Sequence, residues 1–418
     1  MILTRIVLKS AWHRKGSLFL TILSIAISIT LLLGVDKIRK ETRDSFINTI
    51  SQTDLIVGAR SGPINLLLYS VFRIGNATNN VSWDSFQEIA AFEEVAWAVP
   101  ISLGDSHHGF RVMGTTPDYF QYYRYGQSNS LSFAGGHEFE DVYDAVIGSD
   151  VARLLNYNLN EEIVIAHGLV SADFSEHTDK PFVIVGILEK TGTPVDRTVH
   201  VTLEGIEAIH IDWSGGARMP LQLSAEQARK MDLQPKTISA FMVGLDNRIN
   251  TFRLQRRINE YAQEPLLAII PGATLAELWR TISVFEQVLL VISGFVLVAG
   301  LFGMLTTILS TLNERRREMA VLRAVGAHPH HIVLLFVLET FFIVLAGCLA
   351  GIVMLYLLLF LGRPLLGELY GIHIAITLPD LGQWGLVGMA LVLGVLVSFI
   401  PGIIAYRRSL QDGLAIKI

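Results

Sequence analysis

Apolar residues in this chain are concentrated in four long stretches. The stretches at residues 17–35, 288–312 and 384–406 contain no charged residue, and the stretch at 332–362 contains one, Glu339. A helix needs about 20 residues to cross a hydrocarbon core of about 30 Å. The pattern therefore predicts a polytopic α-helical membrane protein with four transmembrane helices, the second preceded by a stalk within residues 281–312.

The short segments beside these stretches differ in positive charge. Cations cluster in three of them: Arg5, Lys9, Arg14 and Lys15; Arg315, Arg316, Arg317 and Arg323; and Arg407, Arg408 and Lys417. The segment 363–383 contains only Arg363, with Glu368 and Asp380. Cytoplasmic loops are enriched in Lys and Arg. We therefore expect residues 1–16, 313–331 and 407–418 in the cytoplasm, and 36–280 and 363–383 on the opposite side.

Residues 36–280 have the alternating pattern of a folded domain. Strands are predicted at 54–57, 96–102, 110–114, 145–148, 163–166, 182–188, 199–203, 238–244 and 267–270, and helices at 83–91, 149–155, 225–231 and 250–262. This mixture predicts a large α+β periplasmic domain between transmembrane helices 1 and 2, in two lobes with seams near 115–140 and 225–240.

Both junctions between this domain and the apolar stretches have helical spacing. Residues 36–50 continue the first stretch with charges and a sparse apolar face, and 275–287 carry apolar residues three and four positions apart. Two helices of this kind form a stalk that either transmits movement or acts as a passive tether.

The segment 58–80 is unusually apolar for a loop flanked by Gly, Pro and Asn. Four of its residues are candidates for contact with a substrate or partner: Leu66, Leu67, Tyr69 and Phe72. Exposed apolar patches mark interaction sites. The alternative is a core helix between two turns.

Composition narrows the class of protein. Of the 418 residues, 51% are hydrophobic and only 17% are charged, which excludes disorder, and the net charge of -5 argues against nucleic acid as a partner. The single cysteine, Cys348, excludes an intrachain disulfide. Among 12 histidines, His107, His108 and His137 are the best candidate metal ligands, and scattered surface histidines are the alternative.

The segment 313–331 predicts a short amphipathic helix. Met319, Leu322 and Val325 are one turn apart, and Gly326 is suited to end the helix before Pro329. Such a helix fits a groove on a soluble partner, whereas the alternative is an ordinary basic loop. Within the third stretch, Glu339 has a structural, coupling or substrate-path role and is a candidate partner of Arg14 or Lys15. Gly347 and Gly351 suit close helix packing.

The run from Glu314 to Ala327, ERRREMAVLRAVGA, resembles the signature of MacB/FtsX-type (type VII) ABC transporter permeases. The order of one span, a large domain and three spans is similar to that family, as are Ala11–Lys15, Glu339 with Gly347 and Gly351, and pieces of a MacB-like periplasmic core domain at 145–155 and 182–188. His328, Pro329, His330 and His331 depart from the family pattern. The resemblance implies that the following residues couple to an ATPase: Glu314, Arg315, Arg316, Arg317, Glu318, Met319, Leu322, Arg323 and Gly326.

The chain contains no G-x-x-x-x-G-K-[ST] phosphate loop. The resemblance therefore implies a non-enzymatic, multi-pass permease of a bacterial inner membrane, whose ABC ATPase partner (similar to the nucleotide-binding proteins MacB and LolD) binds ATP and Mg²⁺, while this chain binds no cofactor. Its other expected partners are a second copy or a paralogous permease, membrane lipids, and a periplasmic adaptor, lipoprotein or metal-binding protein.

The expected work is mechanotransmission, in which ATP hydrolysis changes the periplasmic domain for export, lipoprotein transfer or partner activation. Alternatives are a component of zinc-linked uptake, a membrane-anchored sensor or an FtsX-like cell-division regulator. A membrane enzyme is disfavoured because no catalytic constellation is evident in the sequence.

Overall fold

The computed structural model describes residues 15–47, 49–167, 179–214, 217–218, 223–312, 319, 321, 323–370 and 377–411. The chain divides into two compact units. The helical unit comprises residues 1–41, 283–365 and 374–418, and the α/β unit comprises residues 42–282 and 366–373. The second unit contains every strand among the described residues.

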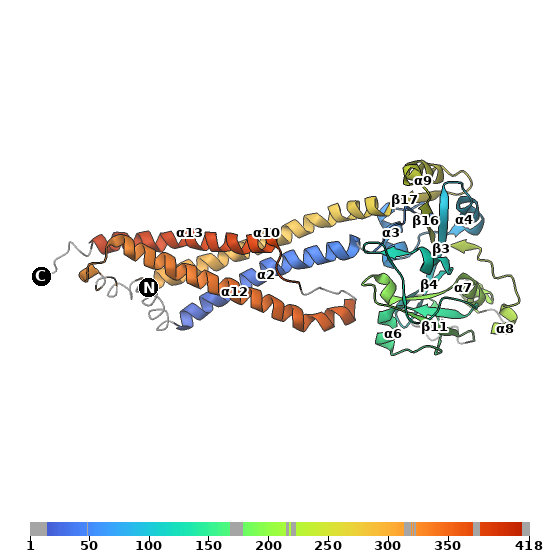
Figure 1. Ribbon diagram of the computed structural model, residues 1–418, viewed down its shortest axis with the longest axis horizontal. Coiled ribbons are helices and arrows are strands. Elements are labelled where there is room, and N and C mark those ends of the chain that lie inside the picture. The colour runs from blue at the N-terminus through green and yellow to red at the C-terminus, as the bar shows by residue number, and fades with distance from the viewer. Residues whose placement is uncertain are drawn as a thin grey trace. The chain divides into compact units, whose positions relative to one another are not determined.

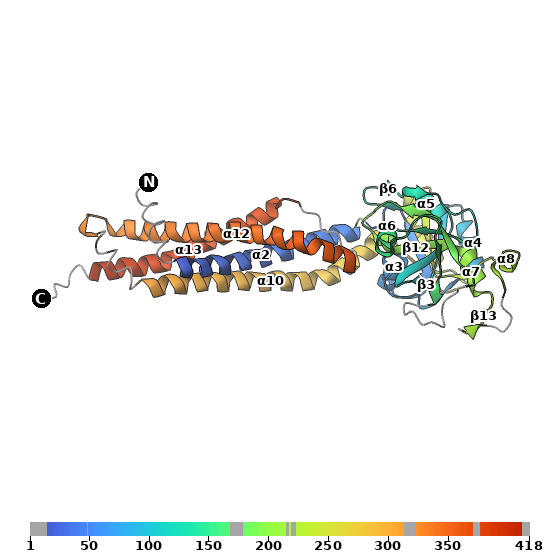
Figure 2. The same ribbon diagram turned by 90° about the horizontal axis from the view of Figure 1, so that it is seen from below.

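Four long helices supply the helical unit: α2 (Lys15–Ile47), α10 (Pro271–Thr311), α12 (Pro329–Tyr370) and α13 (Leu381–Gln411). Within this unit they run lengthwise beside one another (Figures 1 and 2). Each contains a window long and apolar enough to cross a membrane, which confirms the four predicted spans. α12 continues to Tyr370, beyond the predicted end at residue 362.

Small residues let the helices approach closely. A Cβ atom built on Gly347 would lie 2.6 Å from Ile25 Cγ2, and one on Gly351 would lie 2.8 Å from the carbonyl oxygen of Ala26. Thr30 Oγ1 also donates a 2.9 Å hydrogen bond to the Gly351 carbonyl. Both glycines of α12 thus lie where that helix packs closely against α2.

The strands of the α/β unit are short, and most pair in one sheet. They are β1 (Leu55–Ala59), β2 (Val81–Ser82), β3 (Val95–His107), β4 (Phe110–Thr115), β5 (Arg124–Tyr125), β6 (Asn129–Ser130), β7 (Phe133–Gly136), β8 (Asp144–Ile147), β9 (Glu162–Ile163), β10 (Ala166–His167), β11 (Phe182–Leu188), β12 (Thr198–Thr202), β13 (Trp213–Ser214), β14 (Ala217–Arg218), β15 (Thr237–Ile238), β16 (Ala240–Leu245) and β17 (Leu266–Ile269).

The main sheet has the order β17-β1-β16-β3-β4-β12-β8-β11-β7, with β10 beside β3 and β9 beside β11. The long strand β3 joins its halves. Its first part pairs with β16 up to Ile101, and its second part pairs with β4 from Ser102 onward. One continuous strand thus satisfies backbone hydrogen bonds in both halves of the sheet, while the lobe seams near residues 115–140 and 225–240 stay predictions.

Short helices cover the sheet: α3 (Pro63–Phe72), α4 (Trp83–Ala90), α5 (Asp118–Tyr122), α6 (Ser149–Leu155), α7 (Leu203–His210), α8 (Ala225–Ala228) and α9 (Thr251–Asn259), with 3-10 turns η1 (Pro194–Arg197) and η2 (Arg248–Asn250). Three clusters of buried apolar side chains form the core. Most predicted elements are confirmed within a few residues. Helix α7 was missed because it follows β12 without a loop, although Thr202 caps it by accepting a hydrogen bond from the Gly205 N–H.

Candidate functional site

The predicted coupling helix is described only in part. Residues 314–318 and 322 lie outside the described residues. Met319 is 8% exposed, whereas Val321 and Val325 are 60% and 84% exposed. The Gly326 N–H donates a 2.9 Å hydrogen bond to the Arg323 carbonyl, and Gly326 has φ +96°, so the helical turn ends at the predicted glycine. Two exposed valines thus stand one turn apart on this segment.

Three histidines follow this turn and begin α12. The rings of His328, His330 and His331 lie 4.1 to 5.8 Å apart between centroids, and His331 Nδ1 accepts a 3.1 Å hydrogen bond from the His328 N–H. His331 therefore caps an otherwise unpaired backbone donor at the start of the helix. These residues have a structural role in ending one helix and beginning the next.

Glu339 lies in the apolar part of α12, and only 5% of its surface is exposed. Its candidate partner Arg14 lies outside the described residues. A carboxylate among apolar side chains is costly, so its position indicates a specific role inside the helical unit. The structure thus places Glu339 in the interior of this unit, while its role in coupling stays a prediction.

A cluster of charged and polar residues, which we call the clasp, joins the end of the first apolar stretch to the segment before α13. Lys40 Nζ lies 2.8 Å from Asp36 Oδ2 and 2.7 Å from Asp380 Oδ2. Lys37, 4% exposed, donates a 2.8 Å hydrogen bond to Thr377 Oγ1. The clasp links segments 340 positions apart in the sequence.

Asp380 also caps α13. Its Oδ1 accepts a 2.8 Å hydrogen bond from the Gln383 N–H. The hydrogen bonds from Lys40 and from this N–H hold the pKa of Asp380 below its usual range, so the carboxylate stays charged at neutral pH. Sequence reasoning missed the clasp, although an Asp three residues before a Gln at the start of an apolar stretch is a capping signal.

The apolar candidates at 66–72 lie in the interior of the α/β unit. Leu66, Leu67 and Tyr69 are 0–1% exposed and Phe72 is 8% exposed, all on helix α3 within the core. Tyr69 donates a 3.2 Å hydrogen bond to the Ser239 carbonyl, and its burial raises its pKa to about 12. The structure thus shows the alternative, a core helix, and these four side chains are too buried to contact a substrate or partner.

The candidate metal ligands have other roles. His107 is buried, its Nδ1 donates a 2.6 Å hydrogen bond to the Val164 carbonyl, and its Nε2 accepts a 2.9 Å hydrogen bond from the Tyr157 hydroxyl. Burial, with the nearby His108, lowers the pKa of His107 to about 4. His108 and Gly109, at φ +46° and +82°, form the two-residue turn between β3 and β4.

His137 is exposed, and its Nδ1 lies 2.8 Å from the Glu138 carbonyl. Among the described residues, no three His, Cys, Asp or Glu side chains form a group that could hold a metal ion. The three histidines are thus explained by a core hydrogen bond, a turn and a surface position.

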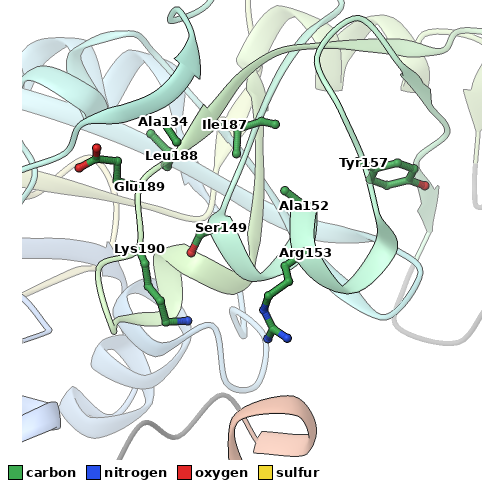
Figure 3. Close-up of a pocket in the computed structure, with 9 residues that line it drawn as sticks. All are labelled: Ala134, Ser149, Ala152, Arg153, Tyr157, Ile187, Leu188, Glu189 and Lys190. Carbon is green, nitrogen blue, oxygen red and sulfur yellow. The ribbon is translucent and has the colours of Figure 1, made fainter. Parts of the chain in front are cut away.

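A hollow of about 550 Å³ lies beside β11 and α6, lined by Ala134, Ser149, Ala152, Arg153, Tyr157, Ile187, Leu188, Glu189 and Lys190 (Figure 3). Arg153 and Lys190 donate hydrogen bonds of 3.1 and 2.8 Å to the same oxygen of buried Asp150. Burial raises the pKa of Asp150, but these two hydrogen bonds outweigh it and hold the pKa below its usual value. The hollow is therefore bordered by cations that are already neutralised in part.

A hydrogen bond connects the core of the α/β unit with the residues that follow α2. The Tyr123 hydroxyl, buried beside α5, donates to the carbonyl of Thr49 two residues after α2 ends. Burial raises the pKa of Tyr123 well above its usual value, so the phenol stays protonated and keeps donating. The Thr49 carbonyl, just after the end of α2, is thus held by a side chain of the core.

Four helices able to span a membrane and an α/β domain between the first two define a multi-pass membrane protein. Residues 18–261 match the model of the MacB-like periplasmic core domain, and residues 290–411 match the FtsX-like permease C-terminal model. The first match covers more than half of the chain. The chain therefore belongs to the family of MacB/FtsX-type ABC transporter permeases.

Two relatives show the range of this similarity. The chain is 27% identical over 297 residues to the pyoverdine export ATP-binding/permease protein PvdT of Pseudomonas savastanoi pv. phaseolicola. This match covers 66% of this chain and 42% of that protein. The chain is 23% identical over 229 residues to the lipoprotein-releasing system transmembrane protein LolE of Haemophilus influenzae, 54% of this chain and 50% of that protein. The chain thus spans half or less of these relatives' length.

Two solved structures are also similar. The periplasmic region of MacB from Actinobacillus actinomycetemcomitans matches with TM-score 0.34 and 9% identity, over 57% of this chain and 95% of that chain. The extracellular domain of the noncanonic ABC-type transporter YknZ from Gram-positive bacteria matches with TM-score 0.31 and 11% identity, over 52% of this chain and 99% of that chain.

Proposed function

We propose that this chain is a mechanotransmission permease: it converts ATP hydrolysis by a separate ABC ATPase into movement of its α/β domain outside the membrane. The observation that carries the proposal is the continuity of two helices. α2 and α10 each run unbroken from the helical unit into residues of the α/β unit. Because a helix is stiff along its axis, a displacement at one end reaches the other without being lost in a loop.

In this proposal the segment 313–331 receives the force. The exposed Val321 and Val325 dock in a groove of the ATPase, which binds ATP and Mg²⁺, and buried Met319 connects that turn to the helices. The proposal places both termini and this segment in the cytoplasm of a bacterial cell with the α/β domain in the periplasm. A second copy or a paralogous permease completes the complex with two ATPase subunits.

The ends of the stalk support transmission. The clasp fixes α2 to the segment before α13, and Tyr123 fixes the residues after α2 to the core of the α/β domain. Export, lipoprotein transfer and partner activation are the outputs compatible with this arrangement. Metal-linked uptake has less support, because His107 is held by core hydrogen bonds, His108 forms a turn and His137 lies on the surface.

Stimulation of the partner ATPase tests the proposal. The chain is purified with its ATPase in lipid nanodiscs, and ATP hydrolysis is measured with and without the chain. Val325→Asp is expected to reduce the stimulation by about fivefold to about a hundredfold, because burying an unpaired carboxylate at the contact costs on the order of 1–3 kcal/mol.

The matched control is Ile74→Asp, an exposed aliphatic residue (54%) in the α/β domain, which should leave the stimulation unchanged. Deletion of residues 314–326 should abolish stimulation while the chain still inserts. If the Val325→Asp chain and the chain lacking residues 314–326 both stimulate the ATPase as well as the parent, the proposed docking segment is contradicted.

A further inference from the structure

Strand β17 ends the main sheet in the order of the described strands. It pairs with β1 through Leu266–Ile269, and no other strand that the structure describes pairs with it. An unpaired strand edge presents a row of N–H and C=O groups that can pair with a strand of another chain. Whether this edge is open therefore depends on what its outward N–H and C=O groups contact.

Both outward groups of Ala268 are bonded to side chains of α9. Asn259 Oδ1 accepts a 2.7 Å hydrogen bond from the Ala268 N–H, and Gln255 Nε2 donates a 3.0 Å hydrogen bond to the Ala268 carbonyl. Successive residues of an antiparallel strand direct these groups to opposite sides, so those of Ala268 point away from β1. The two amides thus offer one acceptor and one donor, as a residue of a neighbouring strand would.

Helix α9 fixes both amides in this position. Gln255 and Asn259 are four residues apart and share one face of the helix. Leu254 and Ile258, both 0% exposed, anchor the helix in the same apolar cluster as β17, and the Asn259 carbonyl accepts a 2.8 Å hydrogen bond from Arg60, the residue after β1. Figure 1 shows α9 lying over β17, the edge strand of the sheet. The contact therefore belongs to the folded domain itself.

Ala268 is the residue that a second strand would need. β17 has only four residues and begins at Leu266, two positions before Ala268. Two positions after it, the Ile270 carbonyl accepts a 3.0 Å hydrogen bond from the Thr274 N–H in the first turn of α10. A ladder with more than one bonded residue of β17 would therefore have to include Ala268.

The opposite edge of the sheet differs in structure. β7 pairs with β11 through a register shift, and Gly136 in β7 has φ +76°. An irregular edge of this kind is a poor template for another strand. β17 instead keeps a regular register over all four of its pairs with β1. Its backbone would therefore be a good template if the two amides were absent.

We propose that Gln255 and Asn259 block the β17 edge and so prevent it from pairing with β17 of a second copy of this chain. An antiparallel edge is self-complementary, because a two-fold axis sets its donors opposite its own acceptors. Two copies in one membrane would therefore pair at this edge without the amides. Neither side chain lies in the segment 313–331 on which the proposed coupling to an ATPase depends.

Hydrogen–deuterium exchange of the Ala268 amide tests the protection. It is measured at single-residue resolution on the full chain in detergent. The serine in Asn259→Ser is too short to reach the N–H, so exchange should become about fivefold faster, because such a hydrogen bond contributes about 1 kcal/mol. Asn259→Asp keeps an acceptor in the same place and should exchange as the parent does.

Association of the full chain, followed by light scattering at rising protein concentration, tests the consequence. In the Gln255→Ser, Asn259→Ser double variant, the fraction in particles larger than those of the parent should rise at least about fivefold, because the edge is open. Its Ala268 amide should regain protection as these particles form. The matched control carries Gln87→Ser and Gln121→Ser, at exposed glutamines of α4 and α5, and should behave as the parent does.

Unchanged exchange in Asn259→Ser overturns the proposal, as does a double variant that exchanges faster and does not associate. Association that leaves the Ala268 amide unprotected also overturns it, because the contact then lies elsewhere. If the double variant does not fold, each single serine variant is measured in the same way. At concentrations without association, every variant should stimulate the ATPase as the parent does, so failure of the edge proposal is distinguishable from failure of the proposed coupling.

Discussion

Two histidines in the core are held neutral by their surroundings. His200 is 0% exposed, its Nδ1 donates a 3.1 Å hydrogen bond to the Val146 carbonyl, and burial, with the charge of Arg73, lowers its pKa to about 3. His107 is held neutral in the same way, with a pKa of about 4. Burial disfavours the charged form of imidazole, so each ring opposes protonation of the folded state.

We predict that acid destabilises the α/β domain through these residues. The unfolded chain binds protons at its histidines below a pH of about 6.5, whereas folded His107 does so only near 4. The unfolded state therefore gains protons in this window, and stability falls by about 1.4 kcal/mol per pH unit for His107. The measurement is the thermal unfolding temperature of the full chain between pH 7 and 4.

The comparison variant is His107→Gln, which does not titrate. Its unfolding temperature should fall less steeply over the same pH range than that of the parent, and all other titrating groups cancel in the difference. Parallel curves for parent and variant would contradict a neutral, buried His107.

At the scale of elements, the helices of the helical unit depend on close backbone approach at particular glycines. Gly351 lies against Ala26 and Ile29 of α2, whereas Gly388 in α13 has open space where its Cβ would stand. Both glycines are inside long helices, so their intrinsic cost in a helix is the same. They differ only in what surrounds them.

We predict opposite effects for alanine at these two positions. Gly351→Ala forces a Cβ to within 2.8 Å of a backbone oxygen and should destabilise the helical unit by about 1–3 kcal/mol. Gly388→Ala should be neutral or stabilising by up to about 1 kcal/mol. Thermal unfolding in detergent compares the two, and equal effects would mean that α12 does not pack on α2 at this point.

The clasp makes a second prediction for these elements. Lys40→Ala and Asp380→Asn each remove one side of the contact, and Asn retains the capping of α13. Because the pair is partly exposed, the coupling energy from a double-mutant cycle should be about 0.2–1 kcal/mol. Additive effects of the two substitutions on the unfolding free energy would contradict a direct contact between α2 and the segment before α13.

At the scale of the whole molecule, the proposed transmission requires two regions to lie on opposite sides of a membrane. The single cysteine, Cys348, is buried, with 1% of its surface exposed. Ile249 and Val325 are similarly exposed in the structure, at 85% and 84%. A cysteine at either position therefore has equal intrinsic access to a thiol reagent.

We predict that a membrane-impermeant maleimide added to spheroplasts labels Ile249→Cys, in the Cys348→Ala background, at least about tenfold faster than Val325→Cys. After permeabilisation the two rates should converge, because exposure is matched. Labelling of Val325→Cys in intact spheroplasts would contradict the orientation expected from the distribution of Lys and Arg.

The sequence by itself determined the four spans, the position of the α/β domain, most strands and the end of a helical turn at Gly326. These features depend on neighbouring residues, because apolar length, alternation and a glycine are local properties. Only the tertiary structure decided that Leu66, Leu67, Tyr69 and Phe72 are core, that His107 is held by Val164 and Tyr157, and that Lys40 meets Asp380. Burial, and contacts between residues far apart in the sequence, depend on which elements pack together. A local sequence pattern does not contain that information.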